Sequence, residues 1–292
     1  MCDKRIIIIA GPTASGKTAY AVETALRVGG EIISADSMQV YRHMDIGTAT
    51  PSVDEMQGVK HWLISEVNPN EEFNVSIFCE KAKGYIADIQ ARGKTPIICG
   101  GTGFYINALL YENSFGETDL ALREELTKFT EAHGAKALHE RLSTVDHKYA
   151  ETVHPNNVRK VVRALEFYEI TGTLFSEHNA AEKQRQSAYE AEIFILTMDR
   201  EKLYERINLR VDKMVENGLV EEVRALLEMG YSPALPAMQG LGYKEIVQHL
   251  KVTNCLPLRE AIDEVKQGSR RYAKRQLTWF RHQLKGTWIE VE

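Results

Sequence analysis

The sequence lacks paired cysteines and long apolar runs, and it carries no excess of positive charge. Its four cysteines, Cys2, Cys79, Cys99 and Cys255, form no C-x-x-C pair, which argues against a disulfide framework and a structural zinc site. No run of 18 apolar residues exists, so no segment is expected to span a membrane. The apolar run at 6–10 is too short for the core of a signal peptide. These absences predict a cytoplasmic protein.

The net charge of −5 predicts no nucleic-acid partner, but it does not exclude one, because a local basic strip is enough to bind phosphates. Such a strip lies between positions 266 and 285, where seven Lys and Arg residues occur without an acidic residue. On a helix, Arg271, Lys274 and Arg275 would share one side. We favour a track for RNA phosphates over a merely solvated helix face. Three interleaved aromatic residues are expected in the core instead: Tyr272, Trp279 and Phe280.

Apolar, β-branched segments alternate along the chain with stretches of helical spacing. The predicted strands are 5–10, 31–35, 95–99 and 192–198. Strands that are apolar along their whole length and alternate with helices are typical of a parallel sheet covered on both faces. Two long helical stretches, 200–229 and 258–284, follow the last of these strands, and a break is expected near Gly218. The sequence therefore predicts an α/β fold.

The segment 113–189 has a different pattern, because helical spacing dominates and no apolar β-branched strand occurs in it. We predict an all-helical insertion domain at 113–189. The α/β core would then be discontinuous and consist of residues 1–112 and 190–292.

A phosphate-binding loop follows the first predicted strand. Residues 11–18 fit the pattern G-x-x-x-x-G-K-[ST] between a strand and a helix, where backbone N–H groups and the helix N-terminus bind phosphate oxygens. The charge of Lys17 suits a terminal phosphate, and the hydroxyl of Thr18 suits Mg²⁺. The predicted ligands of the polyphosphate are Gly11, Pro12, Thr13, Ala14, Ser15, Gly16, Lys17 and Thr18. The loop indicates a polyphosphate without specifying ATP.

Polar groups also follow two other predicted strands. Ligands of open α/β sheets bind at the carboxyl ends of the strands, so Asp36 is expected near the phosphate loop, as a proton acceptor or a water-mediated Mg²⁺ ligand. Ser37 and Gln39 could read a base edge; the alternative is that Asp36 and Ser37 only cap the next turn. In the segment 100–103 three glycines predict close approach of a ligand to the backbone, with Thr102 as the polar side chain.

Taken together, these motifs resemble those of the tRNA dimethylallyltransferases of bacterial type. The segments that carry the resemblance keep their order and spacing over nearly the whole chain: 11–18, 35–41, 44–48, 100–105, 154–159, 163–166, 206–212, 240–243 and 271–280. The phosphate loop alone would be unspecific, but the joint set is highly specific. The resemblance implies a P-loop NTPase-like parallel sheet flanked by helices.

The resemblance also implies a reaction. N6 of adenosine 37, just 3′ of the anticodon in tRNA, would attack C1 of dimethylallyl diphosphate, and diphosphate would leave. Asp36 would be the general base, Thr102 would orient the amine, and Lys17 and Arg210 would hold the leaving group, with Arg206 one turn from Arg210. Mg²⁺ would be the cofactor, with Thr18 as its ligand. Residues assigned to tRNA binding are Asp36, Ser37, Met38, Gln39, Thr102, Arg123, Arg159, Lys160, Arg163, Arg271 and Arg275. A monomer is expected.

Three other functions remain open at this point. A small-molecule P-loop kinase would use the same loop, with the helical insertion as its lid. A prenyltransferase acting on free adenylate is a closer relative, but the basic strip and the large insertion favour a polymeric substrate. A non-catalytic RNA-binding module would not need a complete phosphate loop beside Asp36.

Overall fold

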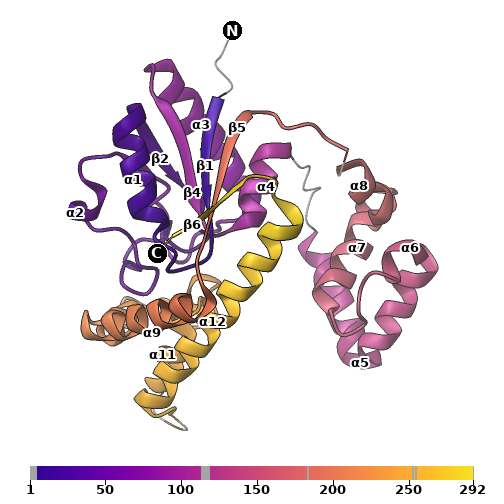
Figure 1. Cartoon of the computed structure of the whole chain (residues 1–292). Coiled ribbons are helices and arrows are strands. Elements are labelled where there is room, and N and C mark those ends of the chain that lie inside the picture. The colour runs from indigo at the N-terminus through magenta and orange to yellow at the C-terminus, as the bar shows by residue number, and fades with distance from the viewer. Residues whose placement is uncertain (1–4, 113–118, 183, 252, 254, 292) are drawn as a thin grey trace. The chain divides into compact units, whose positions relative to one another are not determined.

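The computed structural model describes residues 5–112, 119–182, 184–251, 253 and 255–291. The chain divides into two compact units, Met1–Glu112 with Ser187–Glu292, and Asn113–Gln186 (Figure 1). The sequence analysis placed these boundaries at 112/113 and 189/190. Cys2 and the segment 113–118 lie outside the described residues.

The first unit is built on a parallel sheet with the strand order β3-β2-β4-β1-β5-β6, so the predicted α/β class is confirmed. Its strands are β1 (Arg5–Ala10), β2 (Gly30–Ser34), β3 (His61–Trp62), β4 (Thr95–Gly100), β5 (Glu190–Thr197) and β6 (Thr287–Glu290). The four predicted strands are the four inner ones. The edge strands β3 and β6 have 2 and 4 residues and carry no long β-branched run, so the sequence did not reveal them.

Both faces of the sheet are covered, because alternate side chains of a strand point to opposite faces. Ile7 and Ile9 of β1 pack with Ala21 and Val22 of α1 (Lys17–Val28). The other face carries α3 (Val75–Ala91) and α4 (Gly103–Tyr111) in the cluster that contains Ile8 of β1. The uniformly apolar strands predicted this two-sided burial.

The rest of the first unit is helical. Its elements are α2 (Val53–Met56), α9 (Arg200–Glu216), α10 (Leu219–Glu228), the 3-10 turn Ala237–Gln239, α11 (Tyr243–His249) and α12 (Leu258–Gln283). The predicted break lies at Gly218, whose φ of 99° ends the path of α9 and begins α10. The long α12, drawn in yellow in Figure 1, packs against α9, α11 and α4. This packing brings the basic strip to the carboxyl ends of the strands.

In its described residues the second unit consists of helices, α5 (Leu120–Val145), α6 (His147–Ala150), α7 (Val158–Thr171) and α8 (Phe175–Glu182). Gly134 interrupts α5 with a φ of 84°. Leu126, Leu138 and Leu165 are fully buried in its core. The unit therefore has a hydrophobic core of its own.

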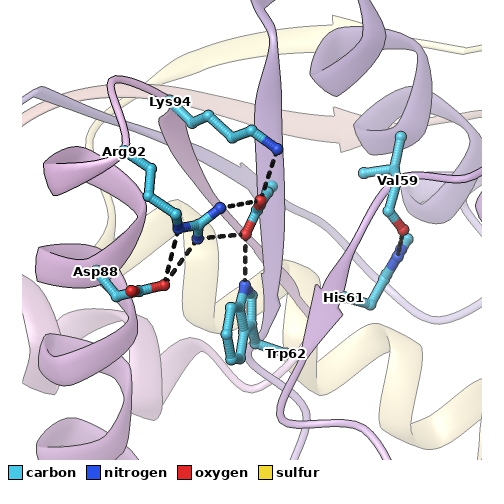
Figure 2. A network of polar contacts seen from close by, with 7 residues as sticks. Val59, His61, Trp62, Asp88, Arg92 and Lys94 are labelled. Atoms are coloured by element: carbon cyan, nitrogen blue, oxygen red, sulfur yellow. Dashed lines mark hydrogen bonds and ion pairs between the residues drawn. The ribbon is translucent and has the colours of Figure 1, made fainter.

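An ionic network fixes the edge of the sheet at the amino end of β2 (Figure 2). The Glu31 carboxylate is almost fully buried and accepts hydrogen bonds from Arg92, from Lys94 at 2.8 Å and from the indole N–H of Trp62 at 3.0 Å. Arg92 also pairs with Asp88 at 2.8 Å, as Figure 2 shows. The hydrogen bonds from Arg92 lower the pKa of Glu31 to about 2, against the opposing effect of burial. The network connects β2, β3 and the end of α3.

Candidate active site

The phosphate loop has the backbone geometry that its sequence predicts. Gly16 begins α1 with a φ of 82°, and Gly11 has a φ of 152°. A Cβ at Gly11 would lie 2.9 Å from the carbonyl oxygen of Leu196, so the neighbouring strand β5 leaves no space for a side chain. Ser15 donates from its hydroxyl to the carbonyl oxygen of Pro12 at 2.8 Å and fixes the turn.

Lys17 is held inside this loop. Its Nζ donates to the carbonyl oxygen of Pro12 at 2.6 Å. Burial, together with the charge of Arg210, lowers the pKa of Lys17 to about 8, against the opposing effects of Cys99 and Asp36. An anion bound in the loop would restore favourable surroundings to this ammonium group.

Arg210 reaches the loop from α9. Its guanidinium donates to Thr13 Oγ1 at 3.2 Å and to the carbonyl oxygen of Thr48 at 3.5 Å. Burial lowers the pKa of Arg210, and the charge of Asp36 opposes that shift. One turn earlier, Arg206 Nη2 lies 3.6 Å from the position that a Cβ at Gly16 would take. The loop, Lys17 and these two arginines form a cationic cluster.

Asp36 and Thr102 come together at the carboxyl ends of β2 and β4. Asp36 Oδ1 accepts a hydrogen bond from the backbone N–H of Met38 at 2.9 Å, and Thr102 Oγ1 accepts one from the N–H of Ser37 at 3.2 Å. The cap considered in the sequence analysis therefore exists, but it uses one oxygen of Asp36. The charge of Asp36 also affects the pKa of Lys17 and of Arg210. A proton acceptor thus lies beside the cationic cluster.

The Gly-rich turn after β4 is packed without free space. A Cβ at Gly100 would overlap the carbonyl group of Ala35, one at Gly101 would overlap the amide of Gln276, and one at Gly103 would overlap the ring of Trp279. The glycines therefore admit protein neighbours, where the sequence analysis expected a ligand to approach. This explains why three glycines occur in four positions.

Gln276 of α12 is a site residue that the sequence analysis missed. Its Oε1 accepts a hydrogen bond from the N–H of Thr13 at 2.9 Å, and its Nε2 donates to the carbonyl oxygen of Gly101 at 2.9 Å. The side chain thereby joins the phosphate loop to the Gly-rich turn. The sequence could have indicated Gln276, because its spacing places a polar side chain on the same helix face as Tyr272 and Trp279.

A carboxylate of α10 holds the segment that supplies the Thr48 carbonyl. Glu222 accepts hydrogen bonds from the backbone N–H groups of residues 45, 46 and 47 at 2.7–3.0 Å, and from the hydroxyl of Tyr243 at 2.6 Å. Glu222 is half-buried, and the sequence analysis assigned it no role in the site. Three N–H groups of one short segment select a carboxylate, which a pattern of single residues does not reveal.

The residues predicted to bind tRNA fall into several settings. Arg271 and Arg275 are exposed on α12, as are Arg159 and Lys160 on α7 of the second unit. Arg123 and Arg163 instead pair with the fully buried Glu166, each at 2.8 Å. The side-chain oxygen of Gln39 accepts a hydrogen bond from the hydroxyl of Ser34 at 2.9 Å, and its amide nitrogen donates to the carbonyl oxygen of Ala49 at 3.2 Å. The roles of all these residues toward RNA stay predictions.

The basic strip is only partly available to a ligand. Lys266 pairs with Asp212 of α9, and Arg270 donates to Asn208 of α9, both at 2.5 Å. Phe280 is fully buried and Trp279 is half-buried, as expected for core aromatics. The exposed cations that remain include Arg271, Lys274, Arg275, Arg281 and Lys285.

Metal binding by protein side chains alone receives no support from the described residues, which contain no cluster of three or more His, Cys, Asp or Glu able to hold a metal ion. The hydroxyl of Thr18 at the start of α1 fits a metal that takes most of its ligands from phosphate and water. In the described part of the chain, no helix has the length and apolarity needed to cross a membrane.

Comparison with known protein families gives two matches. The family described as IPP transferase matches residues 39–283, and the family described as isopentenyl transferase matches residues 4–71. The two matched segments together contain the phosphate loop, Asp36, Thr102 and α12.

Individual relatives match over nearly the whole chain. A tRNA dimethylallyltransferase of Acetivibrio thermocellus is 50% identical over 289 residues, which are 98% of this chain and 92% of the relative. One from Geobacillus thermodenitrificans is 48% identical over 290 residues, 99% of this chain and 91% of the relative.

Solved structures agree with these relatives. The tRNA isopentenylpyrophosphate transferase of Bacillus halodurans has a TM-score of 0.73 at 44% identity, covering 99% of this chain and 90% of that one. A eukaryotic dimethylallyltransferase acting on tRNA has a TM-score of 0.85 at 30% identity, covering 99% of this chain and 74% of that one.

Proposed function

The chain belongs to the tRNA dimethylallyltransferase family, the IPP transferases, and we propose that it transfers the dimethylallyl group of dimethylallyl diphosphate to N6 of adenosine 37 in tRNA. The observation that carries this proposal is the position of Asp36 beside the cationic cluster that contains the phosphate loop, Lys17 and Arg210. A carboxylate next to a polyphosphate site suits attack by a neutral N–H nucleophile on a carbon that bears a diphosphate.

In the proposed reaction the lone pair of N6 forms a bond to C1 of the prenyl group while the bond between C1 and the diphosphate oxygen breaks. The electron pair of that bond leaves with the diphosphate. Asp36 accepts the proton that N6 loses. The hydroxyl of Thr102, which accepts a hydrogen bond from the N–H of Ser37, orients the amine in this proposal. Lys17 and Arg210 stabilise the negative charge that develops on the leaving group. The products are N6-dimethylallyladenosine and diphosphate.

Mg²⁺ is part of the proposal. Thr18 would hold it through its hydroxyl, together with diphosphate oxygens and water, and the ion would neutralise charge on the departing diphosphate. The side chains of the protein would orient the two substrates: Lys17 and Thr13 on the diphosphate, Asp36 and Thr102 on the amine.

For the tRNA we propose two exposed cationic surfaces, Arg271 with Arg275 on α12, and Arg159 with Lys160 on α7. Phosphate contacts of this kind position RNA without reading its sequence. We propose that the protein acts as a monomer and, because its substrate is tRNA, that it acts in the cytoplasm.

The proposal is tested by incubating the protein with Mg²⁺, unmodified tRNA and isotope-labelled dimethylallyl diphosphate, and digesting the tRNA to nucleosides for mass spectrometry. Labelled N6-dimethylallyladenosine is expected. One parallel reaction contains ATP and free AMP in place of both substrates, and a second keeps dimethylallyl diphosphate and replaces only the tRNA with free AMP. Phosphorylated product with ATP, or prenylated AMP without modified tRNA, would contradict the proposal and favour a kinase or a free-adenylate prenyltransferase.

A further inference from the structure

One face of α12 lies against the Gly-rich turn that carries Thr102. Gln276 is bonded to the carbonyl oxygen of Gly101 at 2.9 Å, and a Cβ at Gly103 would overlap the ring of Trp279. Residues three or four apart share a helix face, and Tyr272 precedes Gln276 by four positions. Tyr272 therefore points along the same face toward the turn and Thr102.

Tyr272 is half-buried there, with the guanidinium of Arg275 5.8 Å from its ring centroid. Burial, together with the charge of Asp36, raises the pKa of Tyr272 to about 12. Hydrogen bonding to Thr102 and Gln276 and the charge of Arg275 oppose this rise in pKa. The hydroxyl thus lies near both proposed contacts of the amine, and it keeps its proton at neutral pH. A phenol in this state is a hydrogen-bond donor.

A donor at this place would suit the base proposed to react. In adenine the N6 amine is flanked by N1 and N7, which are both hydrogen-bond acceptors, whereas guanine carries an oxygen at the corresponding carbon. Asp36 and Thr102 have no means of testing the atom next to the amine. A donor beside them would select a base in which an amine adjoins an unprotonated ring nitrogen.

We propose that Tyr272 is a specificity-determining residue, whose hydroxyl donates a hydrogen bond to the ring nitrogen beside the amine held by Asp36 and Thr102. This inference rests on the proposed function, because it requires an adenine in the site. Helix α12 would then have two roles: its exposed arginines would bind the RNA phosphates, and its half-buried Tyr272 would bind the base.

The test compares Tyr272→Phe with the wild type on three anticodon stem-loops that carry adenosine, 1-deazaadenosine or 7-deazaadenosine at position 37. Single-turnover rates and half-saturating RNA concentrations are measured with saturating dimethylallyl diphosphate and Mg²⁺. Each rate is expressed as the ratio of wild type to variant on the same RNA, which cancels the altered nucleophilicity of the analogue. The ratios are then compared between RNAs, which cancels any loss of folded protein. Tyr20→Phe is the matched control, since Tyr20 is also half-buried but packs against Phe194 at 6.3 Å in another part of the unit.

With adenosine, Tyr272→Phe is expected to lower the ratio of rate to half-saturating concentration about 3- to 10-fold, the effect of one hydrogen bond. With one of the two deaza analogues, the ratio of wild type to Tyr272→Phe should be about one. That analogue identifies the ring nitrogen that Tyr272 contacts. The same ratio on all three RNAs would overturn the role of Tyr272, because a merely structural effect does not depend on the ring nitrogen. Absence of product with wild type and adenosine would instead contradict the proposed function itself.

Discussion

The side-chain oxygen of Gln276 accepts a hydrogen bond from the backbone N–H of Thr13 at 2.9 Å, and this bond joins α12 to the phosphate loop. The amide nitrogen of the same residue bonds the Gly-rich turn. A helix whose outer face carries the basic strip therefore also fixes the backbone that is proposed to bind the diphosphate. We therefore expect α12 both to bind RNA and to determine the shape of the site for the prenyl donor.

Gln276→Ala removes both bonds: the N–H of Thr13 loses its side-chain partner, whereas the carbonyl oxygen of Gly101 keeps the hydrogen bond from the N–H of Gly103 at 3.1 Å. The loss of a partner costs about 1–3 kcal/mol for a buried polar group. We expect affinity for dimethylallyl diphosphate, measured by calorimetry, to fall about tenfold or more. Affinity for tRNA should change little, since the exposed arginines remain. Gln283→Ala, at the exposed end of the same helix, is the control. Equal donor affinities in the two variants would show that Gln276 does not shape the loop.

Lys17 predicts a pH dependence of donor binding. Its pKa in the free protein is about 8, and a bound anion favours the charged form. Below this pKa the amine of Lys17 is already protonated, whereas above it the amine must take up a proton when the donor binds. We therefore expect affinity to fall as pH rises through about 8, by at most about one logarithmic unit per pH unit.

Calorimetry with dimethylallyl diphosphate compares the wild type with Lys17→Met over a range of pH. This comparison separates the titration of Lys17 from the titration of the ligand. Lys60→Met, which removes an exposed lysine near Trp62, serves as the control and should keep the wild-type slope. A slope shared by wild type and Lys17→Met would assign the pH dependence to another group.

The basic helix is tested by reversing two exposed charges, Arg271→Glu with Arg275→Glu. Binding of tRNA should weaken strongly, and each lost phosphate contact should remove about 0.7–0.9 from the slope of log affinity against log salt. Binding of dimethylallyl diphosphate should persist. Arg224→Glu with Arg259→Glu, two exposed arginines of α10 and α12, is the matched control. If the double variant keeps the wild-type affinity and salt slope, the RNA track lies on the second unit.

Glu31 predicts an acid-sensitive contribution to stability. Its folded pKa of about 2 lies below the ordinary value of 4.5, so it stabilises the fold above about pH 4.5. That contribution falls as the pH drops from there through the folded pKa. The shift corresponds to about 3 kcal/mol at neutral pH. Urea unfolding of Glu31→Gln should show this loss at pH 7 and a smaller one near pH 3. Glu23→Gln, exposed on α1, should show neither. A deficit that is independent of pH would mean that packing alone accounts for the loss.

The sequence predicted the inner sheet and the first helix well, because local patterns determine them. A β-branched run followed by a glycine loop and a helix specifies β1, and Gly218 specifies the break between α9 and α10. The two edge strands are too short to show such a pattern. Their pairing depends on neighbours far away in the chain, as for Trp62, which donates to Glu31.

The candidate site was predictable where its residues follow strands, as Lys17, Asp36 and Thr102 do. Gln276 and Glu222 were missed because their partners are backbone groups at distances of 263 and about 176 positions along the sequence. A helical face can be read from spacing, but the surface that it meets cannot. The same limit applies to Arg123 and Arg163, which pair with the buried Glu166.

The role of Asp36 as the proton acceptor is tested most directly by Asp36→Asn, which keeps the shape of the side chain and removes its basicity. The single-turnover rate of prenyl transfer to an anticodon stem-loop is measured beside the affinity for that RNA, with Asp54→Asn on α2 as an exposed control. The account predicts a rate lower by about 10²–10⁴-fold at nearly unchanged affinity. A loss of less than about tenfold would contradict it, because general-base catalysis contributes more than that.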